Sequence, residues 1–262
     1  MTPGVIDAGS TLTAANRAIS REAVEHAAAL IGLVSTAIVR NALYTYGRRA
    51  CTPEWARTFP DARYVDECTA DAFAGLDRAS WATRWNEDAA GRWRFETRRS
   101  ADTARGAQPV KLYVNAGGAA LVARLPAIVE RIAASDAAAF KVASDPWGLL
   151  RSDKCVVYLR SLVEARRLAA ELGQVLADDD VQQLAFTAAL DERGAVSLGF
   201  DPPQHVVDEL GERSWRGIVC GLLEVALVDA VSRSDDRPVE ASLAAVAATG
   251  IDTVTWAPIG VS

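Results

Sequence analysis

Lysine is rare in this chain, and its three occurrences lie close together. Arginine supplies most of the 28 basic residues, whereas Lys111, Lys141 and Lys154 fall within one short stretch. A partly buried lysine can lose its proton near neutral pH, while an arginine stays charged. The clustering therefore indicates either a lysine that acts as a base or three ordinary solvated surface charges.

Other polar side chains accompany these lysines along the sequence. The whole set comprises Lys111, Tyr113, Asn115, Lys141, Arg151, Asp153, Lys154 and Tyr158. A neighbouring arginine disfavours the ammonium form of a lysine, so a lysine in this set could act as a general base. Arg151 could bind phosphate through a bidentate fork that Asp153 orients. A salt-bridged, exposed sheet face has the same composition, and spacing alone favours that simpler interpretation.

Strands must position these residues, and the residue pattern predicts them. Alternation from Arg92 to Arg98 predicts a half-buried strand with a charged outer face. A second strand at 111–115 would present a lysine, a phenol and an amide on one face. Further strands are predicted at 140–144 and 154–160, and a hairpin at 184–190 and 195–200.

Helices are predicted on both sides of these strands in the sequence. Helical spacing is predicted for 14–46, 118–134 with a kink at Pro126, 161–173 with a capping box, 206–232 and 239–248. The sequence therefore predicts an α+β class, with a largely antiparallel sheet flanked by helices and a helical N-terminal third. We expect a single domain over 1–262, with a mainly helical subregion at 1–80 and the sheet with its flanking helices at 92–262.

Composition excludes several classes of function. The net charge of −6 argues against a nucleic-acid partner, although basic residues outnumber acidic ones between Arg92 and Lys111. Four scattered cysteines without a CxxC pair, and only His26 and His205, argue against a zinc site. The sequence contains no phosphate loop, dinucleotide fingerprint, nucleophile elbow or HExxH motif. We therefore expect neither a metal nor an organic cofactor.

The sequence also carries expectations about location. The longest weakly polar run, 27–39, is too short to span a bilayer. The amino terminus lacks the basic region of a signal peptide, so we expect a cytoplasmic protein with reduced thiols and no membrane partner.

The stretch FKVASDPWGLLRSDKCVVYL, residues 140–159, resembles the central motif of the HopA-type type III effector family. In that family a lysine-containing strand precedes an Arg-x-Asp segment and an aliphatic strand that ends in tyrosine. KLYVN at 111–115 resembles the preceding strand. IVRNALYTYGRR near residue 38, the Trp-rich segment before Arg92 and Ser214-Trp215 follow the family order, so the resemblance covers most of the chain.

The resemblance implies a function. Members of this family occur as lyase components in pathways for ribosomal peptides, such as class-five lanthipeptides and thioamitides. A phosphotransferase-like kinase phosphorylates serine or threonine of a precursor peptide, and the lyase eliminates phosphate to leave dehydroalanine or dehydrobutyrine. Lys141, Tyr113, Asn115, Arg151 and Asp153 occupy matching positions.

The residue types suit this reaction. We expect Lys141 to remove the α-proton, with Lys111 as the rival base, and Tyr113 or Asn115 to stabilise the enolate-like oxygen. The predicted catalytic residues are Lys141, Tyr113 and Asp153, and the predicted substrate-binding residues are Lys111, Asn115, Arg151, Lys154 and Arg216. Neither histidine is a convincing acid, and phosphate can depart as a stable anion.

One departure from the family pattern bears on activity. The family's late helix carries an arginine where this chain has Val219, so Arg216 must substitute if that arginine binds phosphate. Two alternatives to the lyase remain open. The first is a noncatalytic module that binds a phosphopeptide or the kinase. The second is an effector-like protein that binds a host partner, which the lack of a polar, secretion-type amino terminus disfavours.

Overall fold

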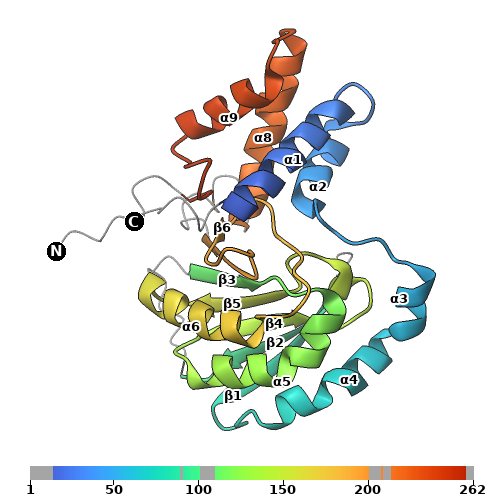
Figure 1. The fold of residues 1–262 in the computed structure, drawn as a ribbon, viewed down its shortest axis with the longest axis vertical. Helices are drawn as coiled ribbons and strands as arrows, with labels where there is room; N and C mark the ends of the chain where they lie inside the picture. Colours follow the sequence, from blue (N-terminus) through green and yellow to red (C-terminus); the bar gives the residue numbers. More distant parts are fainter. Residues whose placement is uncertain (1–13, 89–90, 101–109, 201–207, 209–213, 258–262) are drawn as a thin grey trace, which may run out of the picture. The chain divides into compact units, whose positions relative to one another are not determined.

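The computed structural model describes residues 14–88, 91–100, 110–200, 208 and 214–257. Contacts between Cα atoms divide the chain into two compact units (Figure 1). The helical unit comprises Met1–Gly47, Gln183–Gly194 and Gly199–Ser262, and the sheet unit comprises Arg48–Gln182 and Ala195–Leu198. The single domain predicted over 1–262 stays a prediction, because compactness within each unit does not test whether the units fold separately.

Four described helices form the helical unit. They are α1 (Ala14–Leu30), α2 (Thr36–Thr45), α8 (Trp215–Ser232) and α9 (Pro238–Ala248). Their apolar faces meet in one core that includes Leu43, Val219 and Leu223. The predicted late helix begins at Trp215, where the Ser214 side chain accepts a hydrogen bond from the Gly217 backbone N–H. This helix was expected to begin at 206. Residues 206–207 and 209–213 lie outside the described residues, as does His205.

The described strands form a seven-stranded sheet in the order β1-β2-β4-β5-β3-β7-β6. They are β1 (Trp81–Asp88), β2 (Gly91–Arg98), β3 (Val110–Val114), β4 (Ala139–Ala143), β5 (Cys155–Leu159), β6 (Ala188–Ala189) and β7 (Val196–Phe200). The pairs β1–β2, β2–β4, β4–β5 and β3–β5 are antiparallel. The predicted α+β class and antiparallel sheet are confirmed.

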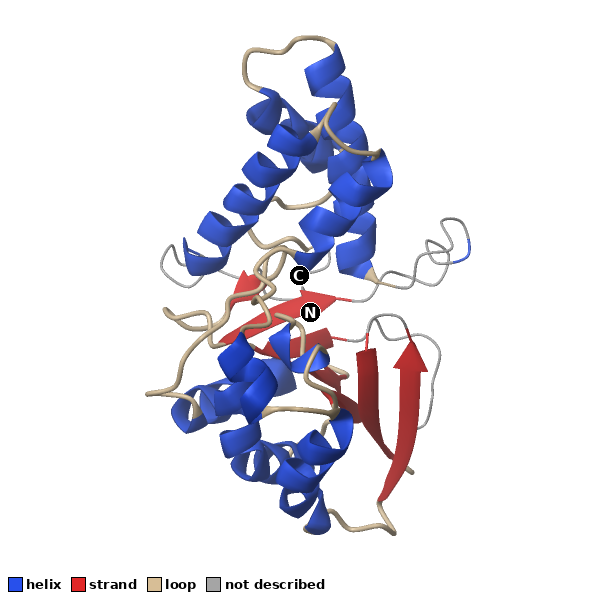
Figure 2. Cartoon of the chain, turned by 90° about the vertical axis from the view of Figure 1, so that its right-hand side faces the viewer, coloured by secondary structure: helices blue, strands red, loops and turns tan. Residues whose placement is uncertain are grey.

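Helices of the sheet unit stack on one face of its sheet (Figure 2). They are α4 (Ala62–Ala74), α5 (Gly118–Ala134) and α6 (Leu162–Val175), and a short α3 (Pro53–Thr58) precedes them. The capping box predicted α6 correctly, because the Ser161 side chain accepts from the Glu164 backbone N–H. The Trp-rich segment before Arg92 forms α3, α4 and β1.

The aromatic residues around Phe140 join these helices to the sheet. Phe140 is fully buried, stacks with Phe73 of α4 at a ring distance of 6.3 Å and meets the edge of Trp81 at 5.5 Å. Such pairs add about 0.5–1.5 kcal/mol beyond their buried area. This contact fixes the helix-covered face as the face that carries Phe140.

The charged side of β2 faces these helices, which corrects the predicted charged outer face. Glu96 pairs with Phe140 across β2 and β4 and is completely buried. Its carboxylate accepts hydrogen bonds from Arg94 at 2.8 Å, Arg78 at 3.1 Å and Thr83 at 3.0 Å. The Arg94 guanidinium also lies 3.7 Å from the Phe73 ring. Paired charges and ring contacts compensate the burial, a possibility that alternation alone does not reveal.

Other arginines of the basic run from Arg92 to Lys111 also have internal partners. Arg98 donates to the backbone carbonyls of Ala133, Ser135 and Ala137, and Arg92 pairs with Asp66. The excess of arginine here therefore ties β2 to its neighbours in the sheet unit. Arg105, which belongs to the same run, lies outside the described residues.

We predict that Glu96→Gln destabilises the protein by roughly 2–4 kcal/mol, because it removes the negative charge from buried arginine partners. This expected loss of stability is smaller than for a fully buried ion pair, because the Arg78 side chain is 49% exposed. Urea unfolding measures the loss. Glu67→Gln is the matched control, since the Arg63–Glu67 pair is exposed and should contribute little. Equal stability of the two variants would contradict the role of the buried network.

Candidate functional site

The face of the sheet opposite Phe140 carries most of the polar residues singled out in the sequence. Register places Phe95, Lys141, Val156 and Tyr113 in one row across β2, β4, β5 and β3. Because directly paired residues share a face, Lys141 and Tyr113 point to the same side. Two strand spacings put their backbones about 10 Å apart. Val156 lies between them and is 2% exposed, and Tyr113 is 6% exposed.

Lys141 and Arg151 share one aromatic neighbour, Trp93. The Lys141 Nζ atom lies 4.1 Å from the centre of the Trp93 ring, and the Arg151 guanidinium carbon lies 5.4 Å from it. The electron-rich face of an indole attracts cations, so the ring positions both side chains. Trp93 is only 3% exposed and therefore holds this position firmly. The structure thus brings together the predicted base and the predicted phosphate-binding arginine.

Asp153 orients Arg151 as the sequence suggested. The Arg151 Nε and Nη2 atoms donate to the two Asp153 carboxylate oxygens at 2.8 and 3.0 Å. Both side chains are nearly buried, at 12% and 10% exposure, so the pair is rigid. This two-point contact fixes the plane of the guanidinium. Sequence reasoning missed Trp93, which the alternation of β2 placed only as a buried residue.

The remaining predicted residues of the sheet lie on the same face. Lys111 pairs with Tyr158 in the next row, with its Nζ atom 5.3 Å from the tyrosine ring. Asn115 is fully buried just after β3 and donates from its amide nitrogen to the Ser197 hydroxyl at 3.0 Å. The amide therefore helps to attach β7, whereas Tyr113 lies nearer the middle of the face.

Lys154 is buried completely within the sheet unit. Its Nζ atom donates to the Ala116 carbonyl at 2.8 Å. Burial, assisted by the positive charge of Arg49, lowers the pKa of Lys154 to about 7. Lys154 can therefore lose its proton near neutral pH. Complete burial argues against direct contact with a substrate, so its predicted binding role stays a prediction.

Arg49 and Asp180 form an ion pair close to Lys154. Both Arg49 Nη atoms donate to the Asp180 carboxylate, which holds the pKa of that carboxyl below its usual range. A Cβ at Gly117 would meet the Asp180 carboxylate and the Arg49 guanidinium, so a larger residue there would have to displace this ion pair. These contacts fix the segment between β3 and α5 in place.

Arg216 lies in the helical unit, at the beginning of α8. Its guanidinium donates to the backbone carbonyls of Ala185 at 3.1 Å and Tyr44 at 2.9 Å, and it lies 4.6 Å from the Tyr44 ring. These bonds give Arg216 a structural role within its unit. Its predicted role in binding phosphate stays a prediction.

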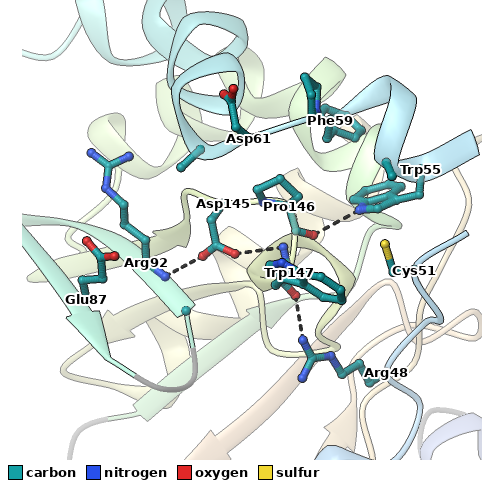
Figure 3. A pocket seen from close by; sticks show the side chains of 14 residues that line it. Arg48, Cys51, Trp55, Phe59, Asp61, Glu87, Arg92, Asp145, Pro146 and Trp147 are labelled. Carbon is teal, nitrogen blue, oxygen red and sulfur yellow. Dashed lines mark hydrogen bonds between the residues drawn. The ribbon is translucent and has the colours of Figure 1, made fainter. Parts of the chain in front are cut away.

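A cleft of about 570 Å³ opens in the sheet unit near the beginning of β2 (Figure 3). Its aromatic residues are Trp55, Phe59 and Trp147, and its charged residues are Arg48, Asp61, Glu87, Arg92 and Asp145. Of these lining residues, the sequence analysis had pointed to Arg92 and to the motif at 140–159, which contains Trp147. The signal that could have revealed more is Trp147 itself, a large aromatic residue in a turn.

In the described part of the chain, no cluster of three or more His, Cys, Asp or Glu side chains is arranged to hold a metal ion. No described helix has the length and apolar character needed to cross a membrane.

Comparisons with solved structures show the fold. The effector protein from Pseudomonas syringae pv. tomato strain DC3000 superimposes with a TM-score of 0.62 at 12% identity, over 93% of this chain and 98% of that one. The effector protein from Pseudomonas syringae pv. syringae strain 61 gives a TM-score of 0.55 at 12% identity, over 95% and 98%. No protein-family model and no curated protein sequence matches the chain.

This chain therefore has the fold of bacterial effector proteins, in line with the expected HopA-type resemblance. At such low identity the likeness concerns the fold and leaves the chemistry open. The sheet face around Trp93 is the candidate functional site, since it gathers the predicted residues of the sheet unit.

We predict that burial of Lys154 makes stability depend on pH. The folded protein releases this proton at about pH 7, and the unfolded chain near pH 10.5. Between these values the unfolded chain binds more protons, so the free energy of unfolding rises with pH. From pH 7 to about 8.5 the rise should reach up to about 2 kcal/mol, and Lys154→Met should abolish it.

Urea unfolding at the two pH values measures this difference. Lys111→Met is the matched control, since Lys111 is a half-buried lysine of the same sheet face, and its variant should keep the wild-type dependence. An unchanged dependence in Lys154→Met would show that another group titrates.

Proposed function

We propose that this protein is a lyase that eliminates phosphate from phosphoserine or phosphothreonine in a peptide and leaves dehydroalanine or dehydrobutyrine. One observation carries the proposal: Lys141 and Arg151 both contact the Trp93 ring, on the sheet face that also carries Tyr113. An elimination of this kind needs a base, a phosphate-binding cation and a hydrogen-bond donor within reach of one residue. The sheet face supplies all three.

The reaction follows from the chemistry of these groups. The neutral Lys141 amine takes the α-proton, and the electron pair of that C–H bond forms the Cα–Cβ double bond. The Cβ–O bond breaks, and phosphate departs with its electron pair. Tyr113 donates to the peptide carbonyl oxygen as negative charge develops there.

Arg151 binds the phosphate of the substrate and the departing anion. The fork to Asp153 keeps the guanidinium plane fixed, so little conformational entropy is lost when phosphate binds. The substrate requires a separate phosphotransferase-like kinase, which is the partner that this reaction implies. The reaction itself uses only protein side chains in its steps.

A noncatalytic module that binds phosphopeptide is the competing function, because the same residues could hold phosphate without removing a proton. The two functions differ in their products. Only the lyase releases inorganic phosphate and leaves an alkene that reacts with thiols. Binding alone leaves the mass of the peptide unchanged and weakens at high salt.

We predict that Lys141→Ala lowers the rate of phosphate release by about 10²-fold or more, the contribution typical of a general base. The assay combines purified protein with a synthetic phosphoserine peptide and follows inorganic phosphate and peptide mass. Lys141→Arg should be equally inactive, because an arginine keeps the charge but does not accept the α-proton. A catalytically competent Lys141→Arg variant would contradict the base role.

The rival base gives the matched control. Lys111→Ala should retain most of the activity, since Lys111 stands in the next row beside Tyr158. Loss of activity in Lys111→Ala alone would transfer the base role to Lys111. Absence of phosphate release from the unaltered protein, with the peptide bound, would favour the noncatalytic module.

We predict that Arg151→Lys raises KM for the phosphopeptide about tenfold or more, since a lysine cannot reproduce the bidentate contact. The expected effect on kcat is smaller if the phosphate is held equally in substrate and transition state. Steady-state phosphate release measures both constants. Arg166→Lys on the exposed surface of α6 is the control and should behave as the unaltered protein. An unchanged KM in Arg151→Lys would remove Arg151 from substrate binding.

A further inference from the structure

The turn from Asp145 to Gly148 belongs to the most distinctive motif of the sequence, yet the proposed reaction does not use it. The Asp145 carboxylate accepts hydrogen bonds from the backbone N–H groups of Arg92, Trp147 and Gly148. A Cβ at Gly91, which has a φ of +127°, would lie 2.8 Å from that carboxylate. The structure thus holds this turn rigidly against the beginning of β2.

This rigid turn presents an aromatic surface to the cleft of Figure 3. Trp147 is 58% exposed, a large fraction for an indole. Opposite it, Trp55 packs on Phe59 at a ring distance of 4.6 Å and donates from its indole nitrogen to the Pro146 carbonyl at 3.1 Å. An exposed tryptophan above an aromatic wall is typical of a surface that binds a peptide side chain.

Negative charge dominates at one end of this cleft. Glu87 is exposed and, among the described residues, forms no hydrogen bond or ion pair. Arg92 lies beside Glu87 in Figure 3, but it is neutralised by Asp66 and also packs on the Trp85 ring at 4.1 Å. Asp61 also lines the cleft, but in Figure 3 it lies beside Phe59 and away from Glu87, and its carboxylate accepts from the Tyr64 backbone N–H. The end of the cleft with Glu87 therefore attracts a cation.

The opposite end of the cleft has different neighbours. Arg48 donates to the Trp147 carbonyl at 3.3 Å, and Cys51 lies near it in Figure 3. The aromatic residues lie between the two ends. A ligand that lies along the cleft therefore needs an apolar group against the indole rings and a positively charged group near Glu87.

We propose that this cleft binds a segment of the peptide substrate in which a lysine or arginine stands next to a bulky apolar residue. Aromatic rings attract both the aliphatic part and the charge of such a side chain, and the carboxylates add an ionic contact. This inference rests on the proposed function only in naming the peptide as the substrate. It places recognition outside the phosphorylated residue, on separate side chains.

The chain connects this cleft to the sheet face around Trp93. Arg92 lines the cleft and the next residue, Trp93, lies beneath Lys141 and Arg151 on the other face. The turn at Asp145 continues within a few residues to Arg151 and Asp153. A peptide bound in the cleft therefore needs only a short extended stretch around the end of β2 to reach the lyase site.

Two exposed cysteines allow a test on the unaltered, full-length protein. Cys51 lines the cleft, whereas Cys68 is exposed on α4 and is not among the cleft residues. N-ethylmaleimide alkylation of each thiol is followed by peptide mass spectrometry, with and without a capped tetrapeptide of alternating leucine and lysine. We expect this peptide to slow alkylation of Cys51 several-fold and to leave Cys68 unchanged. High salt should weaken the protection.

Matched peptides and variants separate the contributions. A capped tetrapeptide of alternating leucine and glutamate should protect Cys51 much less. Trp147→Ala should abolish the protection, and Glu87→Gln should shift it to peptide concentrations up to about fivefold higher, as for an exposed ion pair. Glu130→Gln, an exposed carboxylate of α5, is the control and should leave it unchanged.

Three outcomes would overturn the inference: equal slowing of Cys51 and Cys68, unaltered alkylation of Cys51, or equal protection by the two peptides. This readout requires no catalysis, while phosphate release from a short phosphoserine peptide requires no occupant of the cleft. Loss of one result therefore leaves the other proposal standing.

Discussion

Strand register decides which side chains of the sheet unit can meet. Side chains alternate between the two faces of a strand, so a slip of one residue would exchange the faces completely. The observed register puts Phe140 and Glu96 toward the helices and Lys141, Tyr113 and Trp93 on the opposite face. Aromatic packing of Phe140 against Phe73 and Trp81 secures this register. The candidate site therefore depends on hydrophobic contacts on the far side of the sheet.

Much of the fold was predictable because local rules determine it. The capping box of α6 and the alternation in β3 predicted elements close to those observed. The region 1–80 was expected to be mainly helical, but separate elements around Trp55 and Trp81 were not predicted, because prolines and tryptophans there obscure both periods. The charged side of β2 was wrongly predicted to face solvent, because alternation tells which residues share a face but not which face is covered.

The candidate site was predictable in composition but not in detail. Lys141, Arg151 and Tyr113 follow from residue types, spacing and family resemblance, and the sheet gathers them. Trp93 as the shared contact of two cations needed the three-dimensional arrangement, since β2 and β4 are distant in the sequence. Complete burial of Lys154 could not be predicted either, because its position just before β5 does not indicate which residues cover it. This burial also lowers the pKa of Lys154 to about 7.

The end of the sheet at β1 has a consequence for behaviour at high concentration. β1 is the outermost strand in the order of the described sheet, and Arg84, Trp85 and Glu87 on it are exposed. An outer strand offers backbone groups that can pair with the same strand of another molecule and begin aggregation. The charges of Arg84 and Glu87 oppose such self-association, because pairing of β1 with β1 of another molecule would bring like charges together. Glu87 would thus serve solubility as well as recognition.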